Sequence, residues 1–173
     1  MQEYFKVGKL AATFGVDGQL ILEHSLGKKS RLNGLEAFFI EEKKDIFLPY
    51  FIVSTKIKND KETYITIDGI RSKEDARVLV KKEVWLAEKD FKKFAVDTSP
   101  ISLLGFTIVN KEIEVGQVTE VIEQPHQLLC VVKTEDNEMY IPIHKESLEK
   151  MDKKKRRLYV NLPDGLLEIY KDA

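Results

Sequence analysis

The residue types closest to phosphate chemistry lie in one short loop near the start of the chain, Gly15-Val16-Asp17-Gly18. Glycine lets a backbone approach a ligand closely, and glycine-rich loops can cradle phosphates. This loop is not a Walker loop, because no Gly-Lys-Ser/Thr follows it. It also opens no helix, because residues 19–22 are typical of a strand. We therefore expect a shaped loop at the rim of a barrel, where binding residues often lie.

Residues that usually perform catalysis or hold metals are few and scattered. His24, His126 and His144 have no metal-ligand spacing, and each is expected at the surface or at a strand edge. Cys130, the single cysteine, lies in the apolar run Leu128–Val132, where a thiol is expected to be buried and inert. One cysteine excludes an internal disulfide and fits a reducing cytoplasm. The sequence offers no catalytic constellation, cofactor site or metal site, and it favours a binding protein.

Basic residues offer a second chemistry, contact with phosphate. The run from Lys153 to Arg157 could bind a polyanion, or it could be a solvated turn between two strands. The turn is favoured, because Asp152 and other acidic residues nearby dilute the positive charge. Scattered cations of the first half are further candidates, although each could be ordinary surface: Lys6, Lys9, Arg71, Lys73 and Arg77.

Charge is divided unevenly along the 173 residues, whose net charge is −1. Residues 1–95 hold 18 Lys and Arg against 15 Asp and Glu, a net +3, whereas residues 96–173 hold 10 against 14, a net −4. A basic half could face a polyanion and an acidic half a basic protein, although ordinary solvated surface is the commoner explanation. No apolar run approaches the roughly 18 residues needed to span a bilayer, and the first residues lack a signal-peptide pattern. We therefore expect a cytoplasmic protein with no membrane contact.

The elements that must position these residues are mainly strands. Short apolar runs separated by turn residues predict an all-β fold, and a hydrophobic fraction of 43% is enough for a core. Pro142 suits an edge strand or a bulge. In the first half, strands are expected at residues 4–12, 18–24, 35–41, 48–57, 63–67 and 84–86. In the second half, they are expected at residues 103–109, 115–122, 128–132, 139–143 and 157–162, with a last apolar run at 166–170.

One or two short helices are expected among these strands. Ser72 can cap a helix, with Asp75 three residues later as a short capping box. Apolar residues then follow at helical spacing, at Ala76, Leu79 and Val80. A second short helix could occupy residues 145–151.

The domain boundary is expected in residues 88–100, which are first charged and then turn-like. Phe91 and Phe94 could pin this segment to a neighbouring domain. The simplest organisation is a domain at residues 1–90, a linker at 91–100 and a second domain at 101–173.

Several segments, taken in order and spacing, resemble the RimM family of bacterial ribosome maturation factors over nearly the whole chain. No single segment is decisive, but together they are fairly specific. In the first half they are Val7–Leu10, Thr13–Leu20 and Gly69–Ala76. In the second half Leu103–Phe106, Val115–Val118 and Tyr140–Ile143 look like a PRC-barrel, and the ending Leu158–Leu167 is similar to the family's closing segment.

The resemblance implies two small β-barrels in tandem: an N-terminal six-stranded barrel like that of translation factors, then a C-terminal PRC-barrel. It implies a non-enzymatic, monomeric factor without a cofactor, which assists assembly of the small-subunit (30S) head. The implied partners are 16S rRNA and the small-subunit ribosomal protein number nineteen. Candidate rRNA contacts are Lys9, Thr13, Gly15, Gly18, Arg71 and Lys73, and candidate ribosomal-protein contacts are Phe91, Phe94, Tyr140 and Tyr159.

The chain departs from the family pattern in two places. Phe14 stands where a histidine is usual, Asp17 where a basic residue is usual, and Gln19 where a glutamate is usual. The carboxylate of Asp17 repels phosphate. The aromatic pair usual before the PRC-barrel is also missing, and Phe91 and Phe94 are its possible substitutes.

Two other functions remain open at this point. A PRC-barrel module could bind a small ligand or serve an enzyme, which a deep apolar pocket with convergent polar groups would support. An rRNA-processing enzyme would need a carboxylate cluster or metal site that the sequence does not display.

Overall fold

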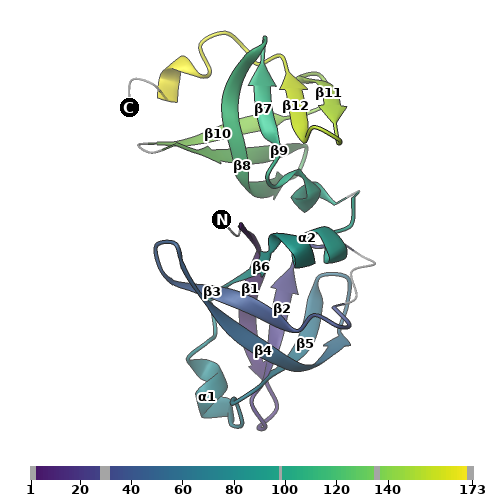
Figure 1. The fold of residues 1–173 in the computed structure, drawn as a ribbon, viewed down its shortest axis with the longest axis vertical. Coiled ribbons are helices and arrows are strands. Elements are labelled where there is room, and N and C mark those ends of the chain that lie inside the picture. Colours follow the sequence, from purple (N-terminus) through teal and green to yellow (C-terminus); the bar gives the residue numbers. More distant parts are fainter. Residues whose placement is uncertain (1–2, 28–31, 98, 135–136, 171–173) are drawn as a thin grey trace. The chain divides into compact units, whose positions relative to one another are not determined.

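The computed structural model describes residues 3–27, 32–97, 99–134 and 137–170. The chain divides into two compact units, Met1–Ser102 and Leu103–Ala173, each with its own six-stranded sheet (Figure 1). The mainly β fold expected from the sequence is confirmed.

A closed barrel forms the first unit, with the strand order β1-β2-β5-β4-β3-β6 around the ring. Every neighbouring pair is antiparallel. The strands are β1 (Tyr4–Phe14), β2 (Gln19–His24), β3 (Ala37–Lys43), β4 (Ile46–Ile57), β5 (Glu62–Ile67) and β6 (Glu83–Ala87).

The inside of this barrel follows the period of two in its strands. Along β5, Thr63, Ile65 and Ile67 are buried, whereas the residues between them keep part of their surface exposed. Successive side chains of a strand point to opposite faces, so these residues must share the core face. Burying one large apolar side chain stabilises a fold by about 1.5–3 kcal/mol. The fully buried core residues include Leu10, Leu20, Leu22, Phe38 and Ile65.

Helix α1 (Lys73–Arg77) begins as the sequence predicts. The Ser72 hydroxyl accepts a hydrogen bond from the Asp75 backbone N–H at 3.1 Å, which satisfies one exposed donor of the first turn. The helix ends sooner than the apolar spacing suggests, before Leu79, and Lys81 then adopts a positive φ of 73°. The chain turns there to enter β6.

Helix α2 (Glu88–Phe94) occupies much of the predicted boundary segment. Phe91 and Phe94 are buried, and the Phe91 ring stacks on Phe5 of β1 with centroids 4.7 Å apart. An ion pair joins Glu88 and Lys92, one helical turn apart. The two phenylalanines thus hold α2 against the first barrel.

The second unit has a six-stranded sheet in the order β10-β9-β8-β7-β12-β11. Its pairs are antiparallel except β7 with β12, which is parallel and sets Leu158 beside Ile108. The strands are β7 (Thr107–Asn110), β8 (Ile113–Gln124), β9 (Gln127–Lys133), β10 (Glu138–Ile143), β11 (Leu148–Asp152) and β12 (Arg157–Val160). Short 3₁₀ turns lie at Pro100–Leu103 and Glu168–Tyr170.

The structure of this unit corrects two predictions from the sequence and confirms a third. The helix expected at residues 145–151 is wrong, because Leu148–Asp152 pairs with β12 as a strand. The strand expected at residues 103–109 begins only at Thr107, after the 3₁₀ turn and Gly105, whose φ is +74°. Pro142 lies on β10, which pairs only with β9 among the described residues, so the edge-strand prediction is confirmed.

Candidate functional site

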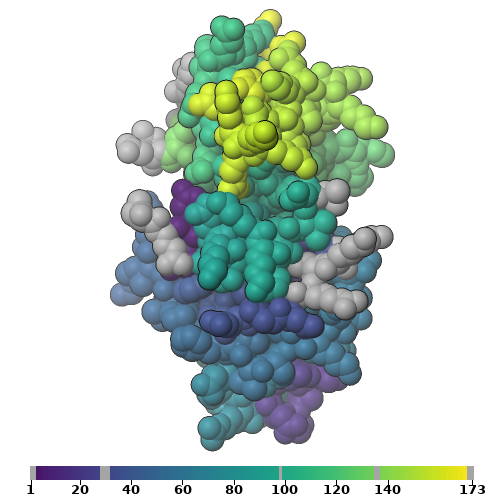
Figure 2. All heavy atoms as spheres, turned by 45° about the vertical axis from the view of Figure 1, so that its right-hand side comes forward, coloured from purple at the N-terminus to yellow at the C-terminus, as the bar shows by residue number. Residues whose placement is uncertain are grey.

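The glycine loop and the start of α1 meet at one end of the first barrel. Gly18 has a φ of +80°, and a Cβ atom there would lie 2.9 Å from the Ile70 carbonyl oxygen and 3.0 Å from the Ser72 nitrogen. The Lys73 backbone N–H donates to the Val16 carbonyl oxygen at 3.1 Å. Figures 1 and 2 show the purple β1–β2 turn beside α1. The contact needs glycine at position 18, because both the backbone conformation and the space exclude a side chain.

Most of the predicted rRNA contacts fall at this end. Gly15 and Gly18 form the turn, and Arg71 and Lys73 lie in the segment packed on it. Thr13 pairs with Leu20 just before the turn.

Lys9 lies farther along β1 from this turn. Its Nζ is 3.6 Å from Glu23 Oε2 on β2, so its charge is partly neutralised. The structure therefore groups five of the six candidates and leaves Lys9 apart.

The charge at this end is mixed. Arg71, Lys73 and Arg77 bring positive charge, but Asp17 lies in the turn and Asp68 lies just after β5. The first turn of α1 adds Glu74 and Asp75. Phosphate attraction alone would be weak here, so shape and stacking must supply much of any RNA affinity.

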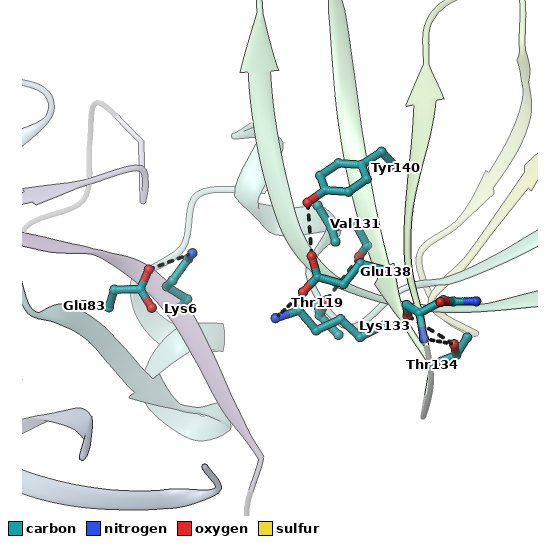
Figure 3. Close-up of polar contacts among 9 residues, drawn as sticks. Lys6, Glu83, Thr119, Val131, Lys133, Thr134, Glu138 and Tyr140 are labelled. Atoms are coloured by element: carbon teal, nitrogen blue, oxygen red, sulfur yellow. Dashed lines mark hydrogen bonds and ion pairs between the residues drawn. The ribbon is translucent and has the colours of Figure 1, made fainter. Parts of the chain in front are cut away.

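A second candidate surface is the outer face of β8, β9 and β10 (Figure 3). The Tyr140 hydroxyl donates to Glu138 Oε2 at 3.0 Å, and Lys133 Nζ lies 3.0 Å from Glu138 Oε1. The Thr119 hydroxyl donates to the Val131 carbonyl oxygen at 3.2 Å. The hydrogen bond to Glu138 is the main cause that raises the pKa of Tyr140. Figure 3 also draws the ion pair of Lys6 with Glu83 in the first unit.

The other predicted ribosomal-protein contacts do not join Tyr140. Tyr159 is on β12, where Lys150 Nζ lies 5.8 Å from the ring centroid, and β12 is not a neighbour of β10. Phe91 and Phe94 are buried within the first unit. Their rings leave little surface for a partner, because they are used to anchor α2.

The basic run forms the β11–β12 turn at residues 153–156, as favoured by the sequence, and its last residue, Arg157, begins β12. Arg156 donates to the Leu104 carbonyl oxygen at 2.5 Å, and Arg157 pairs with Glu114 at 3.3 Å. The Lys155 backbone N–H donates to Asp152 and lowers the pKa of that carboxyl group. The run is thus tied to its own unit by several bonds.

His24 and Cys130 are both core residues. His24 is 3% exposed, which corrects the expectation of a surface or edge histidine, and burial lowers its pKa. Its Nδ1 accepts the Leu26 N–H at 3.4 Å, and its Nε2 lies 3.2 Å from the Thr63 hydroxyl. Cys130 is fully buried, as the sequence predicts, and burial raises the pKa of its thiol to about 12.

Concave and metal-binding features are limited in the part of the chain that the structure describes. No group of three or more His, Cys, Asp or Glu side chains there could hold a metal ion. No described helix is long and apolar enough to cross a membrane. An open hollow of about 420 Å³ on the second unit is lined mostly by polar groups, among them Lys111, His144, Glu146, Asn161 and Asp164. It differs from the deep apolar pocket that a small-ligand module would need.

Sequence reasoning missed one set of residues, on the outer face of the first barrel. Phe14 is 47% exposed, and its ring lies 4.6 Å from that of Tyr64. The signal was present in the alternation of β5, which directs Tyr64 and Thr66 away from the core.

A closed barrel followed by a second unit built on a six-stranded sheet defines a two-unit, mainly β protein. Two family models match the chain: the RimM N-terminal domain over residues 5–91 and the RimM PRC barrel domain over residues 100–166. The chain belongs to the RimM family of ribosome maturation factors, which are not catalysts.

Relatives match the chain from end to end. A "Ribosome maturation factor RimM" of Parabacteroides distasonis is 29% identical over 172 residues, covering 97% of this chain and 98% of the relative. The factor of the same name from Christiangramia forsetii is 24% identical over 171 residues, covering 98% and 97%. A crystal structure of a 16S ribosomal RNA processing protein of Pseudomonas aeruginosa is 14% identical, covers 93% of this chain and 98% of that one, and has a TM-score of 0.45.

Proposed function

We propose that this protein assists assembly of the head of the small ribosomal subunit by holding two partners, 16S rRNA and a basic ribosomal protein. The first unit would contact rRNA, and the second would hold the small-subunit ribosomal protein number nineteen. The observation that carries the rRNA part is the packing of the Gly15–Gly18 turn on residues 70–73, which groups Thr13, Arg71 and Lys73. The protein would act as a monomer in the cytoplasm, without catalysis.

The mixed charge at the end of the first barrel suits a factor that must leave its substrate. Each phosphate contact adds affinity and salt dependence, so few contacts give reversible binding. Binding would orient the assembling head and lower the entropy lost in reaching the correct arrangement.

The second unit suits a basic protein partner through carboxylates beside an aromatic ring. Glu138 and Tyr140 lie on β10, and the charge of Glu120 on β8 also acts on the Tyr140 hydroxyl. Tyr140 is 40% exposed. Carboxylates complementary to a basic partner speed association and fix its orientation.

Sedimentation with immature small subunits tests the function as a whole. We expect the full-length protein to migrate with these particles and with few mature subunits. Equal distribution between the two would contradict the proposal.

Variants then separate the two surfaces. R71A/K73A should weaken association with rRNA-containing particles, whereas K153A/K154A removes the same charge from the exposed β11–β12 turn and should not. E120Q/E138Q should weaken capture of the ribosomal protein more than E146Q/E149Q does. Equal losses within a pair of variants would show that net charge alone explains binding.

A further inference from the structure

Two cross-strand rows on the outer face of the first barrel form a continuous surface, here called the ring strip. The strip crosses β1, β2, β5 and β4, which are consecutive neighbours in the barrel. The first row holds Phe14, Gln19, Thr66 and Ser54, and the second holds Ala12, Ile21, Tyr64 and Lys56. Their neighbours along the strands, such as Leu20 and Ile65, are buried in the core, so the strip residues point outward. Ile21 is only 9% exposed and counts among the buried residues, so it supports the strip from beneath and offers little surface of its own.

Two aromatic rings lie together on this strip. Phe14 is 47% exposed, and its ring centroid is 4.6 Å from that of Tyr64 at an interplanar angle of 45°. A half-exposed phenylalanine on a strand face adds little to the core, but its open ring face can stack on a planar group. Nucleic-acid bases stack on aromatic side chains presented in this way by β-sheets.

Hydrogen-bonding groups lie beside the rings. Gln19 Nε2 donates to the Thr66 hydroxyl at 3.3 Å, and Ser54 pairs with Thr66 across β4 and β5. An amide and two hydroxyls can both donate to and accept from the edge of a base. The Gln19–Thr66 bond uses one donor of the amide, so its other donor and its carbonyl oxygen can still bond to a ligand.

The charge of the strip favours a polyanion. None of its eight residues is acidic, and Lys56 is exposed with no ion pair among the described residues. In the next row of outward-facing residues the lysines are already paired with carboxylates. Lys9 pairs with Glu23 at 3.6 Å, and Lys58 pairs with Glu62 at 2.9 Å. The strip therefore presents a cation that a phosphate can neutralise without displacing a carboxylate.

We infer that the ring strip binds unpaired RNA nucleotides, with bases stacked on Phe14 and Tyr64 and a phosphate at Lys56. This inference rests on the proposed rRNA contact and names its form as single-stranded RNA. Phe14 joins the strip directly to the Gly15–Gly18 turn, so one strand could continue from the rings to Arg71. A duplex keeps its base faces stacked internally and cannot use the rings.

The test measures binding of the full-length protein to a mixed-sequence single-stranded RNA oligonucleotide and to a hairpin duplex of equal length. Wild type should prefer the single strand. F14L keeps apolar volume but removes the ring, and we expect it to weaken single-strand binding about tenfold. F51L is the matched control, because Phe51 is 59% exposed on β4 outside the strip. K56Q should reduce the salt dependence of binding by about one phosphate contact.

Different results separate the strip from the function on which it rests. If R71A/K73A weakens RNA binding but F14L and Y64L do not, the strip proposal is overturned and the rRNA contact stands. Absence of RNA binding by wild type would overturn both. Equal losses in F14L and F51L, or equal affinity for the duplex, would also overturn the strip. Loss of ribosomal-protein capture in F14L with unchanged RNA binding would reassign the strip to a protein partner.

Discussion

The end of the first barrel that carries the Gly15–Gly18 turn and the outer face of the second unit are organised in different ways, the first by backbone contacts and the second by side chains. At the first, backbone contacts fix the surface: Gly18 packs on residues 70–72, and Ser72 caps α1. At the second, exposed side chains bond to one another, as in the series Tyr140, Glu138 and Lys133. A backbone-fixed surface leaves its side chains available to a ligand, whereas a side-chain network must exchange its internal bonds for new ones.

The sharpest challenge to this comparison is to add one methyl group at the turn. G18A must place a Cβ 2.9 Å from the Ile70 carbonyl oxygen in a left-handed conformation, so we expect a loss of about 3 kcal/mol. G15A is the matched control, because its φ is also positive at +67° but nothing lies within 4 Å of the added atom. It should lose about 1 kcal/mol. Urea unfolding measures both, and equal losses would show that the packing of the turn on residues 70–72 is unimportant.

The pH dependence of stability should follow the first barrel, through His24. The native pKa of this residue lies below its ordinary value of 6.5, so below pH 6.5 the unfolded chain binds a proton that the native state does not. The contribution of His24 to the free energy of unfolding is therefore fully present above this pH. It falls as the pH drops below it, by at most about 1.4 kcal/mol per pH unit. Urea unfolding at several pH values between about 7.5 and 5.5 checks this. H24Q should flatten the dependence of the unfolding free energy on pH, whereas H126Q, in an exposed turn, should leave it unchanged.

The cap of α1 offers a smaller test of backbone positioning. S72A removes the acceptor for the Asp75 N–H and should cost about 1 kcal/mol, whereas S72D keeps an acceptor there and should retain most of the stability. Amide hydrogen exchange in residues 70–77 should increase in S72A alone. Unchanged exchange would mean that the packing of the turn fixes this segment without the cap.

The smallest effect is expected in the second region. E138A removes the acceptor of the Tyr140 hydroxyl and the partner of Lys133, all on an exposed face, so the midpoint of urea unfolding should barely change. The pKa of Tyr140 should fall toward its ordinary value of 10.0, because the bond to Glu138 raises it. Ultraviolet difference titration of E138A against Y140F identifies this phenol. A large loss of stability in E138A would contradict the contrast between the two surfaces.

Strand positions were largely predictable, because alternation and turn residues are local signals. The secondary-structure predictions failed where contacts with residues distant in the sequence determine the local structure. Residues 145–151 contain helix formers such as Lys145, Glu146 and Glu149. Leu148–Asp152 nevertheless forms a strand, because it pairs with β12. Helix α2 was overlooked although Phe91 and Phe94 stand three residues apart, because its charged residues resemble a linker.

The sequence predicted the turn of the candidate site but not the contacts that the turn makes. The glycines marked the turn, but its packing on residues 70–72 joins segments about fifty residues apart, and a single sequence does not show this. The exposure of Phe14 also depends on the register of β1 and β2, which includes a bulge between Leu10 and Ala12. His24 was misplaced because burial at a strand end depends on what covers it.

The parallel pairing of β7 with β12 has a consequence for synthesis on the ribosome. The first barrel has all its strands once Ala87 has emerged, whereas Thr107–Asn110 of the second unit, already paired with β8, lacks its parallel partner until residues 157–160 follow. Domains generally fold as units during translation, and pairing across a long loop is slow. The first unit can therefore mature while the second is still being translated, and a premature stop before residue 157 would leave β7 without its parallel neighbour.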